Sequence, residues 1–286
     1  MRILSIDWDY FIDATATERA ALMPDGGNEN LPWGLQIHVW INHYVQNMGF
    51  GGGKLGREHL IEIPIRRKEL VELRTLLAAT VTKKTWVYIA ESHADIFNPV
   101  KNITREFTEE FELINIDHHH DCWRYGEDGA PVDCGNWLAK VIEQSHDNAH
   151  VSWVKNPDSD EWSLGDLTPV ELSQIDHSKP FDMVFLCRSG MWSPPHLDKH
   201  FLVLSKYLNT RCKGQAIHTA KTTREDRWTK TFRNNVKAME QAVEIAKAQL
   251  APAKEFHERR QSRVSKPTIL IADELDRAPK GGEQDE

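Results

Sequence analysis

Short apolar runs alternate with longer amphipathic stretches along most of the chain. The runs have the length of buried strands, and the stretches repeat apolar residues at helical spacing. This alternation is typical of a mainly parallel sheet, because parallel strands need long crossovers that usually contain a helix. The sequence therefore predicts a three-layer α/β fold with helices on both faces of the sheet. The expected strands are Arg2–Asp7, Trp86–Glu91, Glu112–Asp117, His150–Val154, Asp182–Cys187 and Thr268–Ala272.

Three helices are expected around these strands. The apolar spacing of residues 70–77 predicts one helix, residues 135–144 a second, and residues 232–250 the longest. Residues 23–56 are rich in Gly, Asn and Pro, so we expect an irregular loop there.

Length and charge restrict the class of protein. A chain of 286 residues suits one α/β domain, which we expect to cover residues 1–278, with 279–286 as a disordered tail. The net charge of −8 argues against a nucleic-acid partner, since such proteins usually carry a basic excess. No apolar run approaches the roughly 20 residues that span a bilayer. The four cysteines form no C-x-x-C pair and no secretory signal is visible, so we expect a cytoplasmic protein without a membrane partner.

The strongest chemical signal is the segment 114–121, where an apolar strand runs into five consecutive ionisable side chains. At the strand period of two, Asp117, His119 and Asp121 share one side, whereas His118 and His120 point elsewhere. Carboxylates and an imidazole at the carboxyl end of a strand suit a divalent metal ion. The alternative is a solvated His-rich turn.

A second apolar strand ends in two acids, Asp7 and Asp9, that share a face. They lie among aromatic residues and would repel each other unless a cation or a proton lies between them. Both are therefore candidate metal ligands. The alternative is that Asp9 only caps a turn.

His93 follows a third strand and is the last candidate ligand. The 24 residues from His93 to Asp117 suit a helical crossover to a neighbouring parallel strand, so both strand ends would open on the same edge of the sheet. The candidates add up to four carboxylates and two imidazoles, enough for two Mn²⁺ ions with water completing each shell. Two such ions lower the pKa of a shared water.

These segments resemble the metal motifs of the arginase (ureohydrolase) superfamily, D-x-H-x-D and S-x-D-x-D with one upstream histidine. Residues 117–121 match the first motif, residues 5–9 match the second, and His93 fits the upstream position. The motif order is permuted, because the second motif comes late in ordinary arginases. Residues 133–138 and 151–154 look like the peptide arginases, which convert arginine side chains of ribosomally made peptides to ornithine.

The resemblance implies an arginase-like fold and a dinuclear manganese hydrolase that acts on an arginine-containing precursor peptide. It implies that Asp7 and Asp117 bridge the two ions. The other ligands divide into His93 and Asp121 on one ion and His119 and Asp9 on the other.

The implied catalytic residues are Asp121, His119 and Glu91. Asp121 would pass a proton to the departing amine, and Glu91 would orient the guanidinium by paired hydrogen bonds. The polar residues that hold the α-amino and α-carboxylate groups of free arginine find no match here, which favours a peptide substrate.

Other functions fit parts of the same pattern. An N-terminal D-x-D with the later Ile116-Asp117-His118-His119 also resembles the DHH-type Mn-dependent phosphoesterases, although Tyr10 replaces the glycine usual after the D-x-D. The further alternatives are a ureohydrolase acting on a free guanidino compound, a deacetylase related to the arginase fold, and a metal-binding scaffold that presents a peptide-recognition surface without turnover. The sequence does not define the oligomeric state.

Overall fold

The structure is a computed structural model. It describes residues 1–24, 31, 33–46, 60–127, 129–159, 167–212, 216–218, 237–248 and 251. Within these ranges, seven strands form one sheet in the order β5-β4-β3-β1-β6-β2-β7, and every neighbouring pair is parallel. The strands are β1 (Arg2–Asp7), β2 (Trp86–Ala90), β3 (Phe111–Asp117), β4 (Ala149–Lys155), β5 (Leu167–Pro169), β6 (Met183–Cys187) and β7 (Ala216–His218).

Helices connect the strands. The α-helices are α1 (Ala16–Leu22), α2 (Trp33–Gln46), α3 (Arg67–Thr80), α4 (Phe97–Ile103), α5 (Trp137–Ser145) and α6 (Asp198–Arg211), and residues 237–248 are also helical. Short 3₁₀ helices include η1 (Trp8–Phe11), η4 (His93–Ile96) and η7 (Pro195–Leu197), with others at η3 (Leu60–Glu62), η5 (His146–Asn148) and η6 (Leu172–Gln174).

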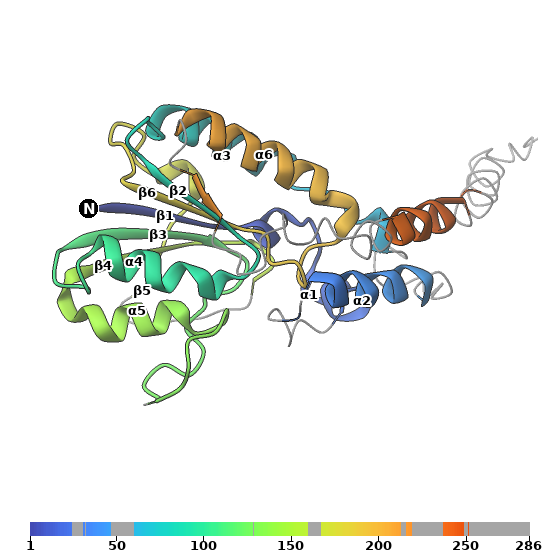
Figure 1. Ribbon diagram of the computed structural model, residues 1–286, viewed down its shortest axis with the longest axis horizontal. Helices are drawn as coiled ribbons and strands as arrows, with labels where there is room; N and C mark the ends of the chain where they lie inside the picture. The colour runs from blue at the N-terminus through green and yellow to red at the C-terminus, as the bar shows by residue number, and fades with distance from the viewer. Residues whose placement is uncertain are drawn as a thin grey trace, which may run out of the picture. The chain divides into compact units, whose positions relative to one another are not determined.

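Helices cover both faces of the sheet (Figure 1). Leu4 on β1 belongs to a buried apolar cluster that includes Leu76 of α3 and Leu204 of α6. Ile3, which points to the opposite face, belongs to a second cluster with Val100 of α4 and Val141 of α5. The central strand is buried along its whole length, as expected for a parallel strand covered on both sides. The predicted three-layer α/β fold is therefore confirmed.

The topology places a switch point between the neighbouring strands β1 and β3. The chain leaves β1 through α3 on one face to reach β2, and it leaves β3 through α5 on the other face to reach β4. Connections that depart in opposite directions open a gap at the carboxyl ends of the strands, where ligands bind in open α/β sheets. The carboxyl ends of β1, β3 and β6 lie side by side at this edge.

Two expectations about this arrangement were wrong. β3 is not a neighbour of β2, because β1 and β6 lie between them, although the crossover does contain a helix and both strands are parallel. The irregular loop expected over residues 23–56 instead contains α2. Ile37, Trp40 and Tyr44 recur at helical spacing and are buried, and this packing outweighs the Gly, Asn and Pro content of the surrounding chain.

Five of the six expected strands occur within a residue of their predicted ends, and β5 and β7 were missed because each is only three residues long. The expected strand Thr268–Ala272 and the tail 279–286 lie outside the described residues. Contacts divide the chain into a unit Met1–Ala246, which contains the whole sheet, and a unit Lys247–Glu286. None of the helices in the described ranges has the length and apolar character needed to cross a membrane.

Candidate metal centre

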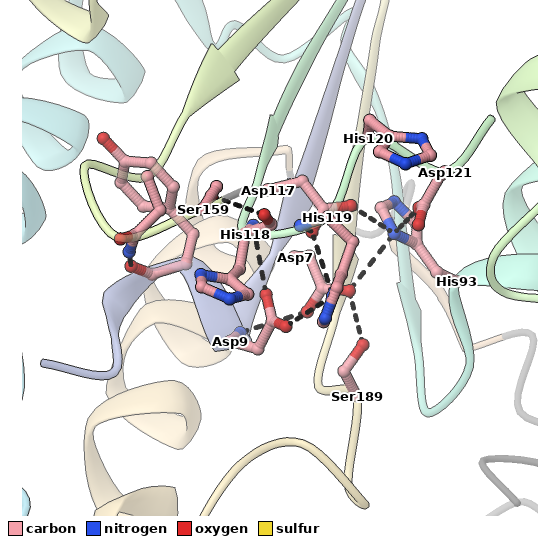
Figure 2. Close-up of polar contacts among 12 residues, drawn as sticks. Asp7, Asp9, His93, Asp117, His118, His119, His120, Asp121, Ser159 and Ser189 are labelled. Carbon is pink, nitrogen blue, oxygen red and sulfur yellow. Dashed lines mark hydrogen bonds and ion pairs between the residues drawn. The ribbon is translucent and has the colours of Figure 1, made fainter. Parts of the chain in front are cut away.

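All six predicted ligands come from three segments that meet at the carboxyl edge of the sheet (Figure 2). Asp7 ends β1 and Asp9 follows in η1. His93 begins η4 after β2, and residues 117–121 run from the end of β3 into a bend. The strand period does not extend through these residues, because β1 and β3 end at their first aspartates. Turns after the strands, rather than continued pleating, bring the side chains together.

A first group of ligands surrounds His93. Its Nδ1 atom lies 3.2 Å from Asp7 Oδ2, 3.1 Å from Asp117 Oδ2 and 2.9 Å from Asp121 Oδ2. This buried nitrogen has no partner in hydrogen-bond geometry. Metal–ligand bonds of about 2.1 Å place neighbouring ligands of an octahedron about 3 Å apart. The ligand atoms of Asp7, His93 and Asp117 all lie within 4.8 Å of one another, the spacing of ligands around one cation, and Asp121 borders this group through its contact with His93.

A second group consists of Asp9, Asp117 and His119, whose ligand atoms lie within 4.8 Å of one another. His119 Nδ1 is 3.0 Å from Asp9 Oδ2 and 4.0 Å from Asp117 Oδ1. The buried Asp9 Oδ2 has no hydrogen-bond partner. Asp117 therefore directs Oδ2 to the first group and Oδ1 to the second, which is the arrangement of a carboxylate that bridges two cations.

Further side chains fix the orientation of the first group. Ser5 Oγ lies 2.6 Å from His93 Nε2, and the hydroxyl of Ser189 donates to Asp7 Oδ2 at 2.5 Å. The indole N–H of Trp137 donates to Asp121 Oδ2 at 2.5 Å. Partners of this kind set the tautomer and direction of metal ligands.

Sequence reasoning assigned no role to these three partners. The position of Ser189 could have identified it, because it follows the predicted strand Asp182–Cys187. The carboxyl end of that parallel strand must lie at the same edge of the sheet as the ligands. Both Ser189 and Asp121 have positive φ angles, 47° and 50°, a region that side-chain-bearing residues seldom adopt. Such conformations persist at sites where surrounding contacts impose them.

The cluster is electrostatically unbalanced without cations. Burial and the neighbouring Asp121 raise the pKa of Asp117, and burial likewise raises the pKa of Asp121. Burial opposes protonation of both histidines, but the carboxylates prevail: the pKa of His93 is raised well above its usual value, and Asp9 raises that of His119 to about 9. Without cations, protons on the histidines and aspartates of the cluster offset the negative charge of its four buried carboxylates. The donor set, its charge and its spacing fit a pair of divalent cations.

The rings of His118 and His120 lie outside both ligand groups found in the described residues, and neither was among the ligands predicted from the sequence. Burial and the Arg19 guanidinium lower the pKa of His118 to about 3, and its backbone N–H donates to Asp9 Oδ1 at 3.4 Å. The ring of His120 packs 4.7 Å from that of Trp123, and its Nδ1 accepts from the backbone N–H of Cys122. Neither histidine belongs to a ligand group found in the described residues.

Glu91, the expected guanidinium-orienting acid, is paired with another side chain of the chain. Its two carboxylate oxygens accept hydrogen bonds of 2.6–2.8 Å from the guanidinium of Arg188, which also contacts Asp198 at 2.8 Å. Arg188 is only 1 % exposed. The carboxylate that we expected to bind the substrate guanidinium is therefore hydrogen-bonded to the guanidinium of Arg188.

Comparison of the chain with protein-family models, with curated proteins and with solved structures finds no match. The functional argument therefore depends on the geometry and chemistry of the centre itself.

Proposed function

We propose that the chain is a dinuclear manganese hydrolase that cleaves the guanidinium of arginine residues in a peptide to give ornithine residues and urea. The observation that carries this proposal is the sharing of Asp117 between two ligand groups, one through each carboxylate oxygen. A bridging carboxylate between two sets of oxygen and nitrogen donors is suited to two closely spaced divalent ions.

Assignment of the ligands follows from the contacts, which place Asp117 in both groups and Asp7 in the His93 group alone. Asp7, His93, Asp117 and Asp121 would hold one ion, and Asp9, Asp117 and His119 the other. Both groups contain carboxylates and imidazoles alone, which suits Mn²⁺ better than structural zinc with its thiolate ligands.

The proposed reaction adds one water across the carbon–nitrogen bond between the arginine side chain and its guanidinium carbon. The alkyl amine leaves as an ammonium group and the remaining carbon becomes urea. When bound, the pair of cations would supply a water of lowered pKa as the nucleophile near neutral pH. Asp121 has a raised pKa and is held by Trp137, so it can accept a proton and deliver it to the departing nitrogen.

A peptide substrate is consistent with how the centre is buried. Asp7, Asp9, Asp117 and Asp121 are at most 4 % exposed. An arginine side chain is long enough to reach such a centre while the peptide backbone stays at the surface. Cys122, Cys134, Cys187 and Cys212 form no disulfide, as expected in a reducing compartment, and we place the activity in the cytoplasm.

The test is incubation of the Mn²⁺-loaded chain with four substrates: an arginine-containing peptide, free arginine, a nucleotide phosphodiester and an acetyl-lysine peptide. We expect release of urea in a one-to-one ratio with a peptide whose mass has fallen by the difference between guanidinium and amine. Phosphate chemistry would instead select the DHH-type phosphoesterase, and release of acetate a deacetylase. Asp117→Asn, which lacks the bridging carboxylate, serves as the inactive control.

A further inference from the structure

One ligand of the metal centre is more exposed than the others. Five of the six ligands are at most 4 % exposed, whereas the His119 side chain is 28 % exposed. Among the described residues, a substrate therefore reaches the centre most directly past the His119 ring. The side chains that border His119 are the ones a substrate meets first.

Trp192 borders His119 on this side. The two ring centroids are 4.6 Å apart with an interplanar angle of 56°, and Trp192 is itself only partly buried. A partly buried indole next to the most accessible ligand offers an apolar, electron-rich surface to an approaching substrate. Among aromatic side chains, tryptophan binds cations most strongly over its ring face.

The turn that carries Trp192 is firmly held. The backbone N–H of Trp192 donates to Ser189 O at 2.8 Å, and Ser193 Oγ donates to Arg188 O at 2.9 Å. The indole N–H of Trp40 donates to the carbonyl of Gly190 at 2.7 Å. Residues 188–193 therefore form a fixed turn rather than an adaptable loop.

The same turn contacts both ligand groups. Its Ser189 donates to Asp7 in the first group, and its Trp192 packs against His119 in the second. Arg188, at the start of the turn, is anchored by Glu91 and Asp198. The position of the indole relative to the metal ligands is thus set by the fold, as required of a residue that selects a substrate.

We propose that Trp192 is a specificity-determining residue, whose indole face binds the guanidinium of the substrate arginine as that side chain enters the metal centre. The inference rests on the proposed function, because it takes the arginine side chain as the substrate. The substrate guanidinium also needs a binding partner, because Glu91, the carboxylate expected to bind it, is hydrogen-bonded to Arg188.

A purely structural role for Trp192 makes a different prediction. If the indole only held the His119 ring in place, its loss would change manganese binding and would affect charged and neutral substrates alike. If it binds the guanidinium, its loss reduces the preference for arginine over citrulline, a neutral side chain of nearly the same shape. The ratio of the two affinities therefore separates the roles.

The experiment uses the full Mn²⁺-loaded chain with an arginine peptide and its citrulline counterpart. Trp192→Leu removes the aromatic face, and Trp192→Phe retains a weaker one. Trp86→Leu is the matched control, because Trp86 is 44 % exposed and lies at the amino end of β2, at the opposite edge of the sheet. Affinity is measured as KM where the peptide is turned over, and otherwise by fluorescence anisotropy of a labelled peptide.

We expect Trp192→Leu to weaken arginine-peptide binding on the order of tenfold and to leave citrulline-peptide binding within about twofold. Trp192→Phe should fall between Trp192→Leu and the parent chain, and Trp86→Leu should match the parent. Manganese stoichiometry should stay unchanged in all three variants. An unchanged arginine-to-citrulline ratio in Trp192→Leu, or a loss of manganese from it, would overturn the inference. Absence of urea would defeat the proposed function alone, because anisotropy would still report whether Trp192 recognises the guanidinium.

Discussion

Ser5 Oγ lies 2.6 Å from His93 Nε2, although 88 residues separate them in sequence. The opposite ring nitrogen, Nδ1, faces three carboxylate oxygens. A neutral imidazole that ligates a cation through Nδ1 carries its proton on Nε2, and Ser5 is placed to accept that proton in a hydrogen bond. The serine therefore selects the tautomer in which His93 can act as a metal ligand.

Ser5→Ala should weaken manganese binding about 10- to 100-fold, because the His93 ring loses the partner that fixes its tautomer and direction. Isothermal titration calorimetry of the metal-free chain measures this affinity. Ser145→Ala is the control, since Ser145 is also fully buried but bonds within α5, to the carbonyl of Ile142. Equal manganese affinity in Ser5→Ala and the parent chain would remove Ser5 from the centre.

Asp117→Asn should bind less manganese than any other single ligand variant, because Asp117 contributes to both ligand groups. His119→Ala should retain one ion, that of the His93 group, and Asp7→Asn should lose turnover together with metal. His118→Ala should keep the full stoichiometry, since its ring belongs to neither group. Elemental analysis after dialysis gives these ratios. Full occupancy in Asp117→Asn would exclude the bridging arrangement.

The sequence located the ligands because unpaired charge at the end of an apolar strand is costly, and all six residues fall at such ends or in the turns that follow. Parallel strands then require those ends to meet at one edge. The sequence could not give the strand order, so it placed β3 beside β2, and the actual order depends on which crossover takes which face. A local pattern contains no information about that choice.

The pairing of Glu91 with Arg188 was not predicted, for a related reason. In the sequence it is an acid beside a metal-site strand, and nothing near it reveals that Arg188, 97 residues away, will pair with it. Ser189 was missed because a single serine after a strand carries no distinctive signal. Partners brought together only by tertiary contacts are not predicted by periodicity or motif spacing.

Manganese affinity should rise with pH up to about 9. In the metal-free chain Asp9 raises the pKa of His119 to about 9 against the opposing effect of burial, and carboxylates raise that of His93. A cation must displace these protons, so each costs about tenfold in affinity for every pH unit below its pKa. Calorimetry in two buffers of different ionisation enthalpy would show the proton release. Affinity that is independent of pH between 6 and 9 would contradict this.

The stability of the metal-free chain should change with pH in the opposite sense. The pKa of His119 is raised from 6.5 in the unfolded chain to about 9 in the folded one, so the folded state binds the proton more tightly. Its contribution is complete below pH 6.5 and is lost as pH rises through about 9. Thermal unfolding in a chelator should therefore show a falling Tm over this range. Saturating Mn²⁺ should raise Tm most at the alkaline end, and a uniform increase across the range would argue against imidazole ligands.

Glu91→Ala should destabilise the fold by about 3 kcal/mol, because it removes a carboxylate that pairs with the buried Arg188 through both oxygens. Chemical denaturation measures this difference. The matched control is Glu112→Ala, which breaks the pair of Glu112 with Arg2 at the amino edge of the same sheet. Glu112 is 44 % exposed there, so its loss should cost less than about 1 kcal/mol.

Measuring both the stability and the KM of Glu91→Ala also decides between two roles for Glu91. If Glu91 supports the turn that carries Ser189 and Trp192, Glu91→Ala lowers the free energy of unfolding, and any change in the KM for arginine peptide accompanies that loss of stability. If stability is retained while KM alone rises, Glu91 contacts the substrate and the Arg188 pair is secondary.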